Sequence, residues 1–182
     1  MCWCTTAWPV PKCWISTAQS PARLCGQRGL VDHALEQQGV HTLQAEGIAF
    51  EAVPRMTAAS GCSAASGIPL THRDLAGNCV FLPGHFARDD AAYDWRSLAR
   101  TGQTRVVYVG VQGLTQIAER LFSHGSAPGT PATIVRDGTR PTQTVIACSL
   151  RRLVQTAPAY GPQPGLLIIG ETVRMSPQYY AG

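Results

Sequence analysis

The sequence predicts an α/β fold in which helices pack on a β-sheet that contains parallel strand pairs. In the second half of the chain, strand-like runs alternate with an amphipathic helix across short links that contain glycine, and strand–helix–strand units of this kind build such sheets. Hydrophobic residues make up 45% of the 182 residues and charged residues only 14%, which is a globular composition. The 18 Gly and 13 Pro predict frequent loops and short helices.

The first half of the chain has a weaker pattern. Residues 1–30 show neither helical nor strand periodicity and hold most of the tryptophans and cysteines. VDHALEQQGVHTLQAEG (31–47) predicts a helix that stops at Gly47. IAFEAV (48–53) alternates apolar and polar residues, and therefore predicts a strand, which Pro54 ends.

The second half is more regular. RVVYVGV (105–111) is a continuous run of β-branched and aromatic residues, as expected for a strand buried on both faces. LTQIAERLF (114–122) places its apolar residues on one helical face, and Gly125 ends that helix. The other expected elements are a helix at 94–102 with Asp94 as N-cap, strands at 132–136 and 166–170, and a strand or strand-to-helix passage at 143–150.

Charge and cysteine usage exclude several classes of protein. The net charge of +4 comes without a run of Lys or Arg, which argues against a nucleic-acid partner. The seven cysteines include no CxxC pair, so we expect reduced thiols rather than a disulfide framework or a metal site. No apolar run approaches the roughly 20 residues of a membrane span, and the first residues do not resemble a signal peptide. We expect a cytoplasmic protein.

The stretch TAASGCSAASGIPLTHRD (57–74) reads as a bare loop, rich in glycine and small residues, on which a ligand could lie against the main chain. It does not contain the GxSxG motif of serine hydrolases. His72 fits a hydrogen-bonded loop histidine better than a metal ligand. Arg73 could form an ion pair with Asp74 or bind a substrate carboxylate, and the residues alone leave both alternatives open.

Glycine-containing turns follow two of the expected strands. VGVQG (109–113) and RDGT (136–139) stand where open α/β sheets collect their ligands, and the start of a helix attracts anions. Simple tight turns would give the same pattern.

The stretch 57–74 closely resembles the central signature of uroporphyrinogen-III C-methyltransferases, which belong to the tetrapyrrole methylase superfamily and also form the C-terminal module of sirohaem synthases. The likeness runs in order from about Leu43 to Val173. It includes LQAEGIAFEAVP (43–54), PGHF (83–86), DWRSLARTGQTRVVYVGV (94–111), IVRDGTRPTQ (134–143) and LLIIGETV (166–173).

The resemblance implies a C-terminal α/β domain with a mixed sheet, and transfer of two methyl groups from S-adenosylmethionine to uroporphyrinogen III, giving precorrin-2 for sirohaem or cobalamin. It also implies a homodimer that binds a tetrapyrrole substrate. His72 and Arg73 are expected to bind the carboxylates of that substrate, whereas no catalytic residue is assigned. The residues that it implies for cofactor binding are Thr57, Ala58, Tyr108, Val109, Gly110, Gly138 and Thr139.

The sequence also departs from the family pattern. The first strand and its GxGPGD-type loop are missing, and Gly39–His41 stand where the second cofactor motif is expected. We therefore expect an atypical, disordered or out-of-frame segment at 1–30, a remnant of the N-terminal domain at 31–56, and the interdomain loop with the C-terminal domain at 57–182. The alternative function is a non-catalytic methylase fragment that dimerises or binds tetrapyrrole weakly.

Overall fold

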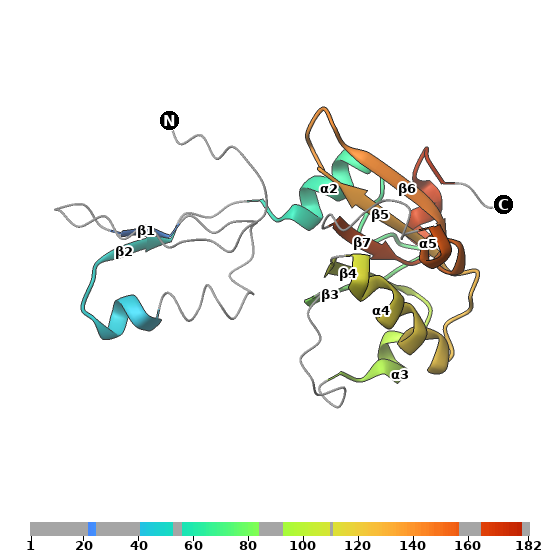
Figure 1. Cartoon of the computed structure of the whole chain (residues 1–182), viewed down its shortest axis with the longest axis horizontal. Coiled ribbons are helices and arrows are strands. Elements are labelled where there is room, and N and C mark those ends of the chain that lie inside the picture. Colours follow the sequence, from blue (N-terminus) through green and yellow to red (C-terminus); the bar gives the residue numbers. More distant parts are fainter. Residues whose placement is uncertain are drawn as a thin grey trace. The chain divides into compact units, whose positions relative to one another are not determined.

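The computed structural model divides the chain into two compact units, Met1–Ala58 and Ala59–Gly182 (Figure 1). The expectations for residues 1–21, 25–40, 53–55 and 84–86 and for Gly110 lie outside the residues that the structure describes. Those described residues are 22–24, 41–52, 56–83, 93–109, 111–156 and 165–179.

In the first unit, strand β1 (Ala22–Leu24) pairs in parallel with strand β2 (Phe50–Ala52). The predicted strand at 48–53 is therefore confirmed in its centre. Residues 41–45 are helical, as predicted for the end of the stretch 31–47. Gly47 has a φ of 67° and its N–H donates to the Gln44 carbonyl at 3.1 Å, so it ends the helix as expected.

The second unit is built on a five-stranded mixed sheet with the order β3-β4-β7-β5-β6. Strands β3 and β4 run parallel, and every other neighbouring pair is antiparallel. The strands are β3 (Asn78–Pro83), β4 (Gln103–Val109), β5 (Pro131–Arg136), β6 (Thr144–Ser149) and β7 (Gly165–Ile169).

The strand–helix–strand unit has an arrangement that its sequence does not reveal. Strand β4 leads through helix α4 (Val111–Ser123) into β5, and both strands point the same way. They are not neighbours, however, because the antiparallel strand β7 lies between them. The expected parallel pairing occurs instead between β4 and β3, a strand that the sequence pattern did not predict.

Helices cover both faces of this sheet. On one face, α3 (Trp95–Leu98), α4 and α5 (Leu150–Thr156) enclose the larger core, which includes Val107, Ile134 and Leu167 from the strands. On the other face, α2 (Ala58–Ser66) and the 3₁₀ helix η3 (Glu171–Met175) enclose a second core with Val106 and Ile168. Figure 1 shows α2 and the α3–α4 pair on opposite sides of the strands.

The entry to α3 matches its prediction. Asp94 accepts a hydrogen bond from the Ser97 N–H at 3.0 Å, which is the expected N-cap. The helix is shorter than predicted and ends at Leu98. Across the described part of the chain, no helix has both the length and the apolar character needed to cross a bilayer.

The reading of residues 57–74 as a bare loop is wrong for its first half, because residues 58–66 form helix α2. Alanine is the best helix former, and its small side chain lets this helix lie close to its neighbours. Gly67, with a φ of 68°, ends α2, and the Ile68 N–H then donates to the Ser63 carbonyl at 3.0 Å. Helix η3 was likewise not predicted.

Candidate functional site

The candidate site begins at the sheet edge where β4 and β5 end. Both strands point to this edge, because each is antiparallel to β7. Strand β7 starts there, with Gly165 opposite Val109. A Cβ atom added to Gly165 would lie 2.8 Å from the Ile134 Cγ1, so only glycine fits between the neighbouring strands. The carboxyl edge of an α/β sheet is the usual place for a ligand.

Tyr108 is the residue of β4 that reaches the α2 face at this edge. It pairs with Leu166 of β7 and packs, half-buried, against the core that α2 and η3 share. Val109 follows as the last residue of the strand. Tyr108 is thus placed on the same face of the sheet as α2.

Helix α2 packs directly on the turn that follows β5. A Cβ atom added to Gly138 would overlap the Cys62 Sγ, and one added to Gly61 would lie 3.3 Å from the Thr139 Cγ2. Glycine at 61 and 138 therefore allows the helix and the turn to approach this closely. Ala58 is the first residue of the same helix, and Thr57 precedes it.

The turn after β5 has an unusual backbone. Asp137 and Thr139 both have positive φ angles, 46° and 68°, and the left-handed region is unfavourable for a β-branched residue such as Thr139. The Arg140 N–H donates to the Asp137 carbonyl at 3.0 Å and closes the turn. Backbone strain of this kind is often found at ligand sites.

His72 and Arg73 lie in a different part of the unit. His72 and Ala76 exchange two backbone hydrogen bonds of 2.9 Å, and Arg73 is exposed in the turn between them. Gly77 then donates to the Gly102 carbonyl at 3.1 Å, where β3 and β4 begin. The described contacts connect this turn to the amino ends of the strands, whereas Gly138 follows a carboxyl end. Their predicted contact with substrate stays a prediction.

Burial strongly shifts the pKa of one titratable group in β3 and of one in β4. Desolvation raises the pKa of the Cys79 thiol to about 11. It also lowers the pKa of Arg105, which is only 3% exposed, to about 10. No group of three or more metal-ligating side chains occurs among the described residues.

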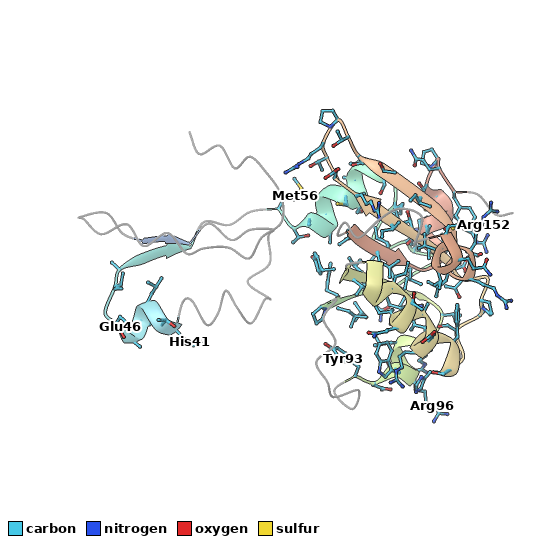
Figure 2. All side chains as sticks on the ribbon, viewed as in Figure 1. His41, Glu46, Met56, Tyr93, Arg96 and Arg152 are labelled. Carbon is cyan, nitrogen blue, oxygen red and sulfur yellow. The ribbon has the colours of Figure 1, made fainter. Side chains whose placement is uncertain are left out.

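Sequence reasoning missed the contacts that join α2 to the turn. Cys62 and Gly61 stand within the quoted signature, and Gln143 ends the string IVRDGTRPTQ, but no role was assigned to them. The described edge offers small side chains, backbone groups and the Tyr108 ring, which suit binding more than acid–base chemistry. Met56, just before α2, is 73% exposed (Figure 2).

Known proteins with a similar sequence are siroheme synthases. The enzyme of Nitrosospira multiformis is 46% identical over 137 residues, which are 75% of this chain and 29% of that protein. The one from Gluconacetobacter diazotrophicus is 46% identical over 138 residues, again 29% of its length. The chain therefore spans less than a third of the length of these curated relatives.

Solved structures show the same fold. The native uroporphyrin-III C-methyl transferase from Thermus thermophilus has a TM-score of 0.67 at 29% identity, over 81% of this chain and 62% of that one. The same enzyme complexed with S-adenyl homocysteine has a TM-score of 0.66 at 30% identity, over 81% of this chain and 64% of that one. A family model, Tetrapyrrole (Corrin/Porphyrin) Methylases, matches residues 34–154, more than half of the chain. The chain belongs to the tetrapyrrole methylase family.

Proposed function

We propose that this chain binds S-adenosylmethionine at the carboxyl edge of β4 and β5 and serves the C-methylation of uroporphyrinogen III to precorrin-2. The observation that carries the proposal is the close packing of α2 on the Asp137–Thr139 turn at that edge. It supports the proposal because the helix that begins with Ala58 contacts the turn that holds Gly138 and Thr139. The Thermus thermophilus relative that was solved with S-adenyl homocysteine supports the choice of cofactor.

The residues present fit one side of an adenosyl group. Thr57 and Ala58 are small and half-buried, Tyr108 offers an aromatic face, and Gly138 and Thr139 belong to the turn after β5. Val109 and Gly110 follow Tyr108 directly in the chain and complete the proposed set of cofactor-binding residues. The sulfonium of the cofactor would supply the methyl group, and alignment contributes more to such a transfer than a strong protein nucleophile does.

The substrate is a polycarboxylate, and His72 with Arg73 is proposed to bind it. Arg73 is exposed, so its guanidinium is accessible for a two-pronged contact with a carboxylate. His72 Nδ1 accepts the Asp74 N–H at 3.2 Å, so Nε2 is the ring atom that would donate to a carboxylate. A cytoplasmic homodimer remains part of the proposal, as the family resemblance implies.

A second candidate function has its own support in the sequence. Only Gly39–His41 stand where the family carries its second cofactor motif. A chain with half of the cofactor contacts could persist as a non-catalytic methylase fragment that dimerises or binds tetrapyrrole weakly. Methyl transfer distinguishes the two functions, because the fragment would release no S-adenosylhomocysteine.

The test is calorimetric titration with S-adenosylhomocysteine, followed by a methyl-transfer assay with uroporphyrinogen III. We expect Ala58→Leu to weaken binding by about tenfold, since a larger side chain would occupy the proposed site at little cost in helix propensity. Ala64→Leu, an exposed change in the same helix, is the matched control and should bind like the wild type. Absence of heat at millimolar ligand would reject the proposal, and binding without turnover would favour the second candidate.

A further inference from the structure

The turn after β5 is held in a conformation that Thr139 disfavours. Asp137 and Thr139 both adopt positive φ angles, and Thr139 is β-branched. Such a backbone persists only where surrounding contacts hold it in place. The contacts that hold this turn therefore determine the shape of one side of the proposed cofactor site.

The side chain of Gln143 bridges this turn and helix α2. The Thr139 N–H donates to Gln143 Oε1 at 2.7 Å, and Gln143 Nε2 donates to the Ala65 carbonyl at 3.2 Å. The Gln143 N–H donates to the Arg140 carbonyl at 3.0 Å, which fixes the backbone from which the side chain extends. The single side-chain amide of Gln143 thus forms hydrogen bonds both to the strained Thr139 and to the last part of α2.

Other contacts of the turn act within it or by packing. Thr142 Oγ1 lies 3.4 Å from Asp137 Oδ2, a long contact that joins the turn only to its own chain segment. Gly138 packs closely on Cys62. The hydrogen bonds of Gln143 connect the turn directly to α2.

We propose that Gln143 is a positioning residue that fixes the Asp137–Thr139 turn against α2 and thereby sets the width of the site for the adenosyl group. Gln143 itself does not need to touch the ligand. Its carbonyl oxygen holds the turn, and its NH₂ group holds the helix. This role rests on the proposed function, because it concerns the same cofactor.

Two substitutions separate the two halves of the bridge. Gln143→Leu keeps the size of the side chain and removes both hydrogen bonds. Gln143→Glu keeps an acceptor for the Thr139 N–H but can no longer donate to the Ala65 carbonyl. The matched control is Gln155→Leu, which makes the same change at an exposed position of α5, a helix on the other face of the sheet.

Each variant is titrated with S-adenosylhomocysteine, and exchange of the Thr139 amide is followed by NMR. We expect Gln143→Leu to raise the Kd about tenfold and Gln143→Glu about threefold, with Gln155→Leu unchanged. Amide exchange at Thr139 should accelerate in Gln143→Leu and stay slow in Gln143→Glu. Thermal unfolding of Gln143→Leu near that of Gln155→Leu excludes a general loss of folding.

The two proposals fail in different ways. If the wild type binds S-adenosylhomocysteine and Gln143→Leu binds it equally well, Gln143 is not a positioning residue and the proposed function stands. Unchanged exchange at Thr139 in Gln143→Leu would also overturn the bridge. If the wild type itself does not bind, the proposed function is rejected, and the role of Gln143 toward the cofactor is rejected with it.

Discussion

Gly138→Ala tests how tightly helix α2 packs on the turn after β5. The added Cβ would overlap the Cys62 Sγ, and it would lie 3.3 Å from the Cys62 Cβ and 3.5 Å from its Cα. Cys62 is only 8% exposed, and its Cα belongs to the helix backbone. Relief of the overlap therefore requires a rotation of the buried Cys62 side chain or a shift of α2 or of the turn.

The size of the effect follows from these distances. Overpacking by one methyl group costs typically about 1–3 kcal/mol, and the direct overlap with sulfur places Gly138→Ala near the upper end, about 3 kcal/mol. Cys62→Ala removes that sulfur at a cost of about 1 kcal/mol. In the Cys62→Ala background the nearest atom is the Cβ at 3.3 Å, which is a tight but tolerable contact. In that background Gly138→Ala should cost less than about 1 kcal/mol. The difference from its cost in the wild type is a coupling energy of about 2 kcal/mol between the two substitutions.

The assay is urea denaturation followed by circular dichroism for the wild type, both single variants and the double variant. Gly129→Ala is the matched control, because a Cβ added there meets no atom within 4 Å, and it should change the free energy of unfolding by no more than about 0.5 kcal/mol. Equal costs of Gly138→Ala in the two backgrounds would refute the packing of Gly138 on Cys62.

Three further predictions concern the sheet itself. Gly170→Ala should lower stability by about 2–4 kcal/mol in urea denaturation, because Gly170 has a φ of 146° and the new Cβ would lie 2.8 Å from the Gln103 carbonyl oxygen; an unaffected midpoint would contradict this backbone contact. Arg105→Leu should raise the unfolding free energy by about 1 kcal/mol, since Arg105 Nε and Nη1 are buried without a hydrogen-bond partner among the described residues; a less stable variant would show that the guanidinium is compensated. The Cys79 thiol, with its pKa raised to about 11 from 9.0 by burial, should resist alkylation until the pH approaches 11. Its contribution to stability is complete below pH 9 and is lost as the pH rises to 11, and mass spectrometry of the alkylated peptide at each pH would detect an early reaction that rules out the shift.

Local patterns predicted the central strands and the main helix. The β-branched run of β4 and the apolar run of β7 were placed within two residues of their observed bounds. Helix α4 was predicted from its apolar stripe. Leu114, Ile117 and Leu121 of this stripe are completely or almost completely buried. These elements bury large side chains at regular intervals, so the spacing of apolar residues in the sequence predicts them.

Other features depend on contacts that no local window contains. Helix α2 has small residues on all sides, so it shows no clear apolar stripe, and its packing on Gly138 becomes visible only in three dimensions. The insertion of β7 between β4 and β5 depends on pairing between residues about sixty positions apart. For the candidate site, the resemblance predicted the Gly138 turn, but not that Cys62 and Gln143 hold it.

The position of β7 has a consequence for how the second unit is assembled. Until Gly165–Ile169 leave the ribosome, the β3–β4 and β5–β6 pairs have no strand to connect them, and the inner edges of β4 and β5 carry unpaired amides and carbonyls. The sheet can close only with β7, the last of its five strands in chain order. A chain that ends after helix α5 would therefore present two open half-sheets, which are prone to self-association and to capture by chaperones.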